Sequence, residues 1–571
     1  MKNKIIILLI AVCAMSCNKF LDEMPDNRAE LDSEVKLEQL MRSAYPGSNW
    51  FAVAEFTSDN IDECPHWFRE TDPFYEELFF WKESQTPDNE SPGAIWEHHY
   101  GMIATANNVL QAIDLMGGPT TPKLKAIQGE ALVVRAYGHF ILVNIFCQHY
   151  SPDHAETDMG IPYITEPETT LNPMYDRGTV AEVYRKIEAD LLEGLPLIDD
   201  AIYNQPKWRF NRQAAHTFAS RFFLFYQKWE ETIEHSTLAL GSNPREFLRD
   251  NYLQASFPNN SPTTGMEYSR SGHKCNFLLA TVASAMGVWA GAGYGYIERF
   301  SHTTMIAYWE TIRARGPWGP WQDIPPSGNL PRHNTFIVNS LGFQGAMNRV
   351  MTGFFPYLFE VVDPVARTGY WRSVHVLLSA EEALLNRAEA NVMRGRYGNA
   401  LADINHWVGN TIRPPDGRPE TAIIKTVLTQ QDIIDWANSF EFYKPTIPTH
   451  KKELNPDFPL LTTQRNYMYL ILHMRRHEFM HGGMRLFDLK RYGIEVERRM
   501  IAGTGNVPNE GNPDPIVISL YEPKLIAEKR SPKLVIQIPP DVISAGMPKN
   551  PTELLPTSPY TGQIAVPILN H

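Results

Sequence analysis

Residues 377–407 read LLSAEEALLNRAEANVMRGRYGNALADINHW, and their pattern predicts two helices joined by a tight turn. Apolar side chains recur at helical spacing on both sides of Gly395, the residue at which the first helical pattern stops. Small side chains on the first helix allow a neighbouring helix to approach closely, and they are Ala380, Ala383, Ala388 and Ala390. The stretch therefore predicts a helical hairpin of the kind that stacks into repeats.

The segment 395–400 supplies the glycine, the aromatic ring and the alanine by which a tetratricopeptide repeat turns between its helices. The segment 228–232 is a weaker copy. Further helical pairs are expected at 95–116 with a helix through 132–147, and at 179–197 with 212–226. We predict a mainly α fold, a tetratricopeptide-like helical repeat scaffold with little β structure, whose repeat helices span about 94–146, 179–240 and 376–408.

Long segments rich in proline, glycine and aromatic residues separate these helices. They are 150–177, 241–295, 313–333, 443–463 and 503–515. Loops of this length within a compact domain are uncommon unless they bind something. We therefore expect a loop-rich binding region at about 241–335 and, because no low-complexity linker divides the chain, one domain over 17–571.

The first 17 residues are typical of an export signal that ends in a lipidated cysteine. Lys2 and Lys4 precede the apolar run 5–14, which is too short to span a bilayer, and Ser16 precedes Cys17. A small residue before a cysteine is what lipoprotein signal peptidase requires. We predict a signal peptide over 1–16 and lipid attachment at Cys17, with no later segment of membrane-spanning apolar length.

Charge and cysteine content limit the possible ligands and the sources of stability. A formal charge of −13 over 571 residues disfavours nucleic acid as a ligand. After Cys13 is removed with the signal, Cys64, Cys147 and Cys275 permit one disulfide at most, so that stability is expected to come from packing.

Several motifs, in order along the chain, together resemble the SusD/RagB family of outer-membrane nutrient-binding lipoproteins. Each motif is weak alone, and the order is specific. They are Cys17 with the following segment 18–25, the Ala106-Asn107 helix, Gly129-Glu130-Ala131 with Arg135-Ala136-Tyr137, Arg177-Gly178-Thr179-Val180, Ala388-Glu389-Ala390, Arg475-Arg476-His477-Glu478, the segment 483–489, Gln537-Ile538-Pro539-Pro540 and Asn550-Pro551. The last four form a C-terminal signature over 471–551.

The resemblance implies a surface-exposed lipoprotein of the cell outer membrane. Such a protein forms a lid on a TonB-dependent SusC-like barrel, which supplies the transport step, and the two partners enclose the ligand together. The resemblance also implies that the chain is not an enzyme and needs no cofactor.

One motif points to an enzyme instead. His477-Glu478-Phe479-Met480-His481 is a literal H-E-x-x-H, in which two histidines one helical turn apart bind zinc and the glutamate activates water. No suitable third ligand follows, and Glu478 has a structural place in the family pattern. We expect no metal here and keep a zinc peptidase as the least favoured alternative.

Acidic residues Asp59, Asp62 and Glu63 match no calcium loop and are interpreted as a solvated turn. Aromatic residues in the loops are more informative, because sugar rings stack on exposed indole and phenol planes. Trp318 and Trp321 lie in a Gly-Pro-Trp repeat that suits a stiff platform. The predicted stacking residues are Trp81, Trp289, Tyr294, Tyr296, Trp318 and Trp321.

The favoured function is therefore capture of an oligosaccharide at the cell surface and its delivery to the transporter. Capture of a peptide by a lid of the same family remains open, because a polar cleft with free backbone groups would serve it.

Overall fold

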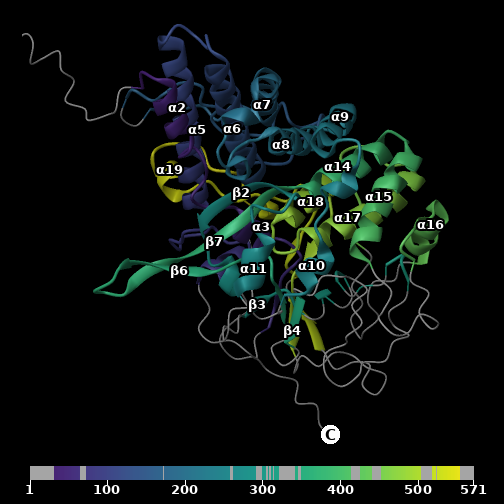
Figure 1. Cartoon of the computed structure of the whole chain (residues 1–571). Helices are drawn as coiled ribbons and strands as arrows, with labels where there is room; N and C mark the ends of the chain where they lie inside the picture. Colours follow the sequence, from purple (N-terminus) through teal and green to yellow (C-terminus); the bar gives the residue numbers. More distant parts are fainter. Residues whose placement is uncertain are drawn as a thin grey trace, which may run out of the picture.

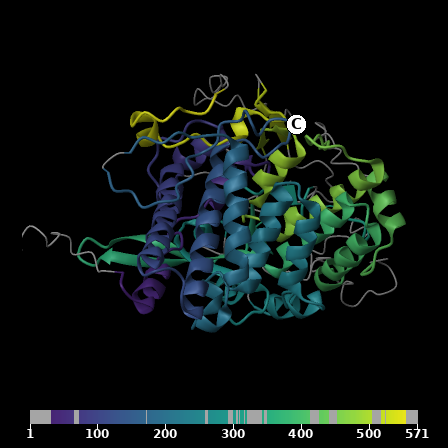
Figure 2. The same ribbon diagram turned by 90° about the horizontal axis from the view of Figure 1, so that it is seen from above.

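Helices packed side by side in chain order form most of the molecule (Figures 1 and 2). The computed structural model describes residues 31–64, 73–170, 173–257, 262–290, 299–303, 306–307, 310–312, 314, 316–319, 341–344, 349–412, 425–439, 452–502, 517–521 and 524–552. The long helices are α5 (Pro92–Leu115), α6 (Pro122–Phe146), α7 (Val180–Gly194), α8 (Arg212–Phe225), α9 (Trp229–Leu240), α14 (Ala380–Met393), α15 (Tyr397–Thr411), α16 (Gln430–Ser439), α17 (Thr462–Glu478) and α18 (Met484–Tyr492). Helix α5 packs against α6, α6 against α7, and α8 against α9, and α14 contacts α9, α15 and α17. The predicted mainly α, tetratricopeptide-like architecture is confirmed.

Local sequence fixes where these helices begin. Thr121 accepts a hydrogen bond at its Oγ1 from the Leu124 amide, 3.1 Å away, at the start of α6. At α7, Thr179 accepts from the Glu182 amide at 3.2 Å, and the Glu182 carboxylate accepts from the Thr179 amide at 3.0 Å. This reciprocal pair is a capping box, which explains why the Arg-Gly-Thr-Val motif marks a helix start.

Glycine permits the close approach of α6 to the end of α7. A Cβ atom placed on Gly129 would lie 2.6 Å from the Cβ of Leu197 and 2.8 Å from the carbonyl oxygen of Gly194. Real Cβ contacts are not this short, so the glycine of the Gly-Glu-Ala motif is required by helix packing.

Short helices complete the scaffold at the N-terminal side, in the middle and near the C-terminus. They are α2 (Glu34–Met41), α3 (Phe51–Thr57), α4 (Pro73–Phe79), α10 (Asn251–Ala255), α11 (Pro262–Tyr268), α12 (Met286–Trp289) and α19 (Pro540–Ser544). The region 241–290 is thus partly helical, and the expected loop character there is wrong for these segments.

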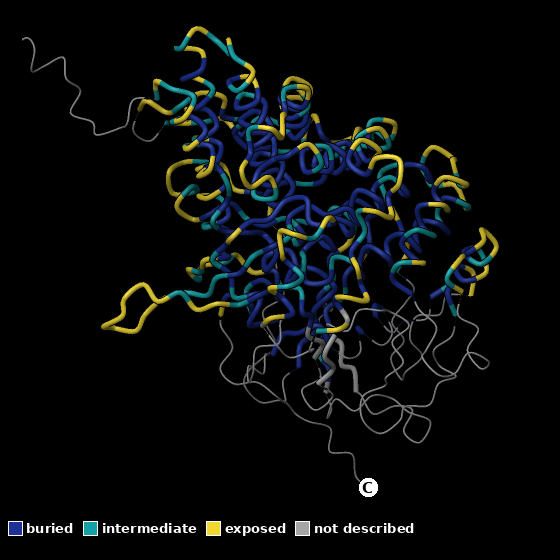
Figure 3. The backbone as a smooth tube through the Cα atoms, in the orientation of Figure 1, coloured by how far each residue is buried: buried dark blue, intermediate teal, exposed yellow. Residues whose placement is uncertain are grey.

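The β structure is confined to small sheets. Strand β7 (Thr368–Ser379) pairs antiparallel with β2 (Asn276–Ala283) and β6 (Leu358–Asp363). Residues 377–379, predicted to begin a helix, therefore end β7, and α14 starts at Ala380 behind the capping hydroxyl of Ser379. The exposed β6–β7 hairpin projects from the body (Figures 1 and 3). The remaining strands are β1 (Asp62–Glu63), β3 (Phe300–Ser301), β4 (Leu341–Gln344), β5 (Arg349–Thr352), β8 (Val496–Glu497), β9 (Arg499–Ala502), β10 (Val517–Leu520) and β11 (Ile526–Ala527).

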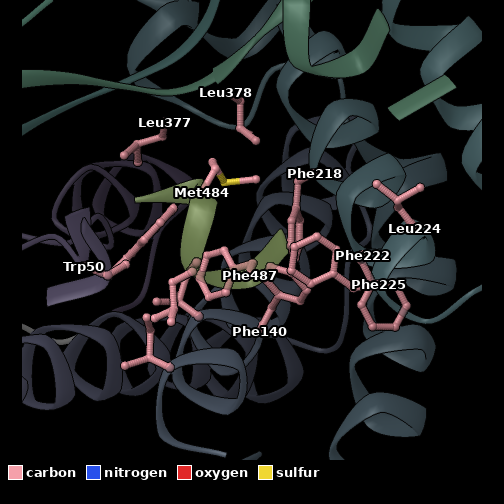
Figure 4. Packing of buried hydrophobic residues seen from close by; sticks show 14 of the residues in the cluster. Trp50, Phe140, Phe218, Phe222, Leu224, Phe225, Leu377, Leu378, Met484 and Phe487 are labelled. Atoms are coloured by element: carbon pink, nitrogen blue, oxygen red, sulfur yellow. The ribbon is translucent and has the colours of Figure 1, made fainter. Parts of the chain in front are cut away.

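The core joins segments that lie far apart in the sequence (Figure 4). The ring of Phe140 on α6 lies 5.3 Å from that of Phe225 on α8, and Phe225 lies 5.6 Å from Phe487 on α18. Phe487 in turn lies 4.9 Å from Trp50, which precedes α3. The N-terminal segment, the repeats and the C-terminal signature therefore share one apolar cluster.

Helix α6 is long and apolar enough to cross a membrane, which the sequence interpretation did not anticipate. Its apolar window is entirely buried inside the protein, as expected for a core helix. Among the described residues, Cys64, Cys147 and Cys275 are buried, and none of them forms a disulfide.

Buried ion pairs account for many charged residues of the motifs. Arg135 on α6 forms a two-bonded pair with Asp190 on α7, at 2.6 and 2.7 Å. Glu130 accepts two bonds from Arg209 at 2.6 Å. Arg475 on α17 pairs with Asp488 on α18 at 3.0 Å. Removing one partner of such a pair leaves a buried charge uncompensated, so these residues serve the scaffold.

Candidate functional site

A cleft of about 1060 Å³ opens between the segment leading into α5 and the C-terminal segment around α19. We call it the α5 cleft. Its first wall comprises residues 81–98 except Glu90, Ile95 and Trp96, together with Thr57 and Leu78; its second wall is formed by Pro532, Lys533, Val535, Ile536, Gln537, Ile538, Pro539, Pro540, Asp541, Ile543, Ser544, Lys549, Pro551 and Thr552. Ligand sites of proteins span roughly 300–1,000 Å³, so this volume suits a ligand of several units.

A carboxylate on α4 holds the first wall in place. Glu77 accepts hydrogen bonds from the hydroxyls of Ser84 and Thr86, both at 3.0 Å, and from the amide of Gln85 at 3.0 Å. The wall then enters α5, where the Ser91 hydroxyl accepts from the Ala94 amide at 3.2 Å. The loop is therefore fixed at both ends before any ligand binds.

Asn550 fixes the second wall to the scaffold. Its side-chain amide donates to the carbonyl oxygens of Phe146, at 2.9 Å, and Ile536, at 3.0 Å. Its side-chain oxygen accepts from Arg177 at 2.8 Å, and its backbone amide donates to the Gln537 side chain at 2.8 Å. The Asn-Pro motif and the Gln-Ile-Pro-Pro motif are thus two halves of one wall.

Trp81 lies at the inner end of the cleft with only 8% of its surface exposed. Its indole nitrogen donates to the Thr57 carbonyl oxygen at 3.1 Å. The Arg498 guanidinium lies 4.4 Å from the ring centre and the Lys533 ammonium 5.9 Å from it. Its backbone is left-handed, with φ of +53°, which costs on the order of 1 kcal/mol in a non-glycine residue and is most often found at functional sites.

An ion pair and a buried carboxyl group border the cleft. The exposed ammonium of Lys549 in the second wall lies 3.6 Å from the carboxylate of Glu83 in the first, so that one ion pair joins both walls. Glu90, in the same segment as the first wall, is buried. Its carboxyl group accepts hydrogen bonds from the Ser284 hydroxyl at 2.6 Å and from the Ala285 amide at 2.8 Å. Burial raises the pKa of Glu90 to about 8, so the group is largely protonated at neutral pH.

Part of the exposed lining is suited to bind hydroxyl groups and the C–H faces of a polar ligand. Gln85 and Asn89 present amides, Glu97 presents a carboxylate, and prolines such as Pro87 and Pro540 present flat apolar surface. Amides and carboxylates bind hydroxyl groups, while apolar surface covers C–H faces.

Two of the predicted stacking residues, Trp318 and Trp289, are buried in the structure. Trp318 is 1% exposed, 5.8 Å from the ring of His473 and 6.1 Å from that of Trp407. Trp289 is 5% exposed, and its indole nitrogen donates to the Phe300 carbonyl oxygen at 3.1 Å. Both rings pack in the interior. Composition could not predict this, because proline and glycine around an aromatic residue stiffen a loop but do not determine whether the ring is buried.

Of the three predicted tryptophans within the described ranges, Trp81 alone lines the α5 cleft. Tyr294, Tyr296 and Trp321 lie outside the described residues, and so does Cys17.

The H-E-x-x-H residues do not form a zincin site in this structure. Helix α17 ends at Glu478, and His481 follows in a left-handed conformation with φ of +61°, so the two histidines are not one helical turn apart. Glu478 accepts from the indole nitrogen of Trp407 at 2.8 Å. Burial raises the pKa of Glu478 to about 7, and the nearby Glu381 carboxylate acts in the same direction.

The acidic residues that follow α3 are buried, which corrects their interpretation as a solvated turn. Asp59 pairs with Arg485 at 2.7 Å, Asp62 with Arg499 at 2.7 Å, and Glu63 with Arg299. Each acid has an arginine from a distant segment as its partner.

Sequence reasoning missed the walls of the cleft. The closing motifs were noticed as family markers, but nothing in the sequence shows that residues 532–552 face residues 81–98. The one available signal was that two polar, proline-containing motifs lie within 15 residues of each other near the C-terminus.

The fold is a helical-repeat scaffold with an open cleft, and comparisons with known proteins agree on the fold. A sequence profile described as "Starch-binding associating with outer membrane" in the SusD-like group matches residues 19–224. No curated protein matches the chain significantly.

Solved structures match over nearly the whole chain. A SusD superfamily protein from Bacteroides thetaiotaomicron is 16% identical with a TM-score of 0.56, covering 91% of this chain and 98% of the other. A SusD superfamily protein from Bacteroides vulgatus is 17% identical with a TM-score of 0.56, covering 90% and 97%. A SusD-like carbohydrate binding protein from Bacteroides vulgatus is 16% identical with a TM-score of 0.52, covering 90% and 97%. At these identities the structures establish the fold, and the profile shows that residues 19–224 are similar to the SusD-like group.

Proposed function

We propose that this protein is a cell-surface lipoprotein that captures an oligosaccharide in the α5 cleft and delivers it to a TonB-dependent outer-membrane transporter of the SusC type. The observation that carries the proposal is the preformed cleft of about 1060 Å³ on a SusD/RagB scaffold. The lipid anchor at Cys17, the surface location and the transporter are parts of the proposal that follow from the family resemblance. In this role the chain binds the ligand and catalyses no reaction.

The lining favours a sugar. Gln85 and Asn89 offer donors and acceptors to hydroxyl groups without carrying a charge. Proline faces and the accessible edge of Trp81 offer surface to the C–H faces of a sugar ring. Because Glu77 and Asn550 fix both walls in advance, little conformational entropy is lost on binding.

A peptide is the second candidate, and one observation favours it. The lining carries charged side chains of both signs, among them Glu83, Glu97, Lys533 and Lys549. Charged groups of both signs would pair with a peptide's termini and side chains.

Calorimetric titration separates the two. We expect the purified protein to bind a neutral oligosaccharide from a panel of plant and host glycans, and to ignore a panel of mixed peptides. Replacing Gln85 and Asn89 together by alanine removes two hydrogen-bonding groups, each contributing about 0.5–1.5 kcal/mol. Binding should weaken by roughly 5- to 150-fold.

The matched control is Gln431→Ala with Asn438→Ala. Both residues are exposed on α16, at the end of the molecule away from α19 (Figures 1 and 2). Tight binding of peptides with no binding of glycans would replace the sugar hypothesis by the peptide hypothesis. Equal binding by the cleft and control variants would place the ligand elsewhere.

A further inference from the structure

Three buried side chains from distant segments converge beside α3, and none of the three lines the α5 cleft. They are Glu55 in α3, His302 directly after β3 and His481 after α17, and they are 0%, 1% and 0% exposed. One carboxylate oxygen of Glu55 and one ring nitrogen of each histidine lie within 4.8 Å of one another. Two imidazoles and a carboxylate are a common ligand set for transition metals.

The two carboxylate oxygens of Glu55 differ in their hydrogen bonds. Glu55 Oε1 accepts from the Asn60 side-chain amide at 2.9 Å and from the His481 backbone amide at 3.1 Å. The other oxygen, Oε2, is buried and makes no hydrogen bond with any residue in the described ranges. An unsatisfied buried carboxylate oxygen is costly, so its place beside two histidines points to a ligand.

The surroundings of His302 permit the tautomer that a metal site needs. The Thr311 hydroxyl lies 3.2 Å from the Ile306 carbonyl oxygen and 3.0 Å from His302 Nε2. When the hydroxyl donates to the carbonyl oxygen, it accepts from Nε2–H, and Nδ1 carries the lone pair. Within the described part of the chain Nδ1 has no hydrogen-bond partner, and a neutral imidazole held in this way by its other nitrogen is the form that binds metal.

His481 is positioned by an unusual backbone. Its φ of +61° is uncommon for a non-glycine residue, and it turns the chain away from the axis of α17. Its Nδ1 lies 3.2 Å from the hydroxyl of Thr352, and its ring is edge-on to that of His302 with centres 5.5 Å apart.

We propose that Glu55, His302 and His481 bind a divalent transition-metal ion of the zinc class. Zinc bonds of about 2.0–2.2 Å place ligand atoms roughly 3.4 Å apart, so the three groups need to close by at most about 1.4 Å. Calcium and magnesium prefer oxygen ligands throughout and fit this set poorly. Because the ligands come from α3, β3 and the turn after α17, the ion would tie together segments more than 400 residues apart and stabilise the fold.

This site differs from a zincin site although both would use His481. A zincin would require His477 and Glu478, and Glu478 is bonded to Trp407 instead. The two assignments therefore predict opposite effects of substitution at His302 and at His477.

The test uses purified protein without a polyhistidine tag, stripped with a chelator and titrated with Co²⁺ and Zn²⁺. We expect one Co²⁺ per chain with visible d–d absorption, displaced by Zn²⁺, and a melting temperature that rises on addition of Zn²⁺. Both signals should be lost in His302→Gln and Glu55→Gln and kept in His477→Gln, with circular dichroism confirming that each variant is folded.

The absence of stoichiometric Co²⁺ and Zn²⁺ binding by the parent protein would overturn the proposal, whatever the variants do. Retention of the ion by folded His302→Gln, or its loss from His477→Gln alone, would also overturn it. Glycan binding is measured separately on the same chelator-treated protein, so failure of the metal site and failure of glycan capture can be distinguished.

Discussion

Replacing Trp318 by alanine should destabilise the protein and leave ligand binding intact. Trp318 is 1% exposed, and its ring packs against His473 and Trp407. The backbone carbonyl oxygen of Trp318 accepts a hydrogen bond from the Lys425 amide at 2.7 Å. A buried tryptophan removes about 150–250 Å² from water, which at roughly 25 cal/mol per Å² corresponds to about 4–6 kcal/mol. Truncation of such residues typically costs about 3–5 kcal/mol.

The assay is urea unfolding together with glycan titration on the same variant. We expect the free energy of unfolding to fall by about 3–5 kcal/mol and the dissociation constant in the folded protein to change by less than about twofold. Trp208→Ala, at a partly buried ring, is the matched control and should cost less. Unchanged stability combined with lost binding would refute the burial argument and restore Trp318 as a stacking residue.

Three further outcomes are expected. Cys17→Ala should release the protein from membranes in cells that lack the partner barrel, and its persistence in the membrane fraction would contradict lipid anchoring. Between pH 4.5 and 8, burial keeps Glu90 protonated in the folded state while the unfolded chain loses that proton. The free energy of unfolding should therefore fall with rising pH by up to about 1.4 kcal/mol per pH unit. Glu90→Gln should flatten this dependence in urea unfolding at pH 5 to 9, whereas Glu83→Gln, at an exposed residue, serves as the control and should not. Glu478→Gln should leave hydrolysis of a casein substrate at the background level of the parent, and a peptidase activity that this substitution abolishes would revive the enzyme hypothesis.

Local patterns predicted the helices well because their signals are local. The reciprocal bonds of Thr179 and Glu182 span three residues, and the turn at Gly395 needs only a glycine with φ of +70°. Motif order then indicated a resemblance to the SusD/RagB family, and solved structures of SusD superfamily proteins share the fold. Leu377 and Leu378 were misassigned because an apolar run at a strand–helix junction has no period of its own.

The site was harder to predict because its parts are distant in sequence. Trp81 was selected by position, yet the opposite wall comes from residues more than 400 positions later. Trp318 was misjudged because composition does not reveal what covers a ring. His481 was assumed to continue a helix, whereas Gly482 and Gly483 follow it and the helix ends at Glu478.

Selective blockage of the α5 cleft tests the central claim most directly. Gly93 lines the cleft, and a Cβ atom there would meet nothing closer than the Ser91 hydroxyl at 3.7 Å. Gly101, two turns further along α5 and outside the cleft, has nothing within 4 Å. The native cysteines at 64, 147 and 275 are buried, so a polyethylene-glycol maleimide should label Gly93→Cys or Gly101→Cys selectively in protein produced without residues 1–17.

The measurement is glycan affinity by calorimetry before and after labelling. We predict that labelled Gly93→Cys binds at least tenfold more weakly than the same protein unlabelled, while labelled Gly101→Cys keeps its affinity. Equal affinity of the labelled and unlabelled Gly93→Cys protein would contradict capture in the α5 cleft.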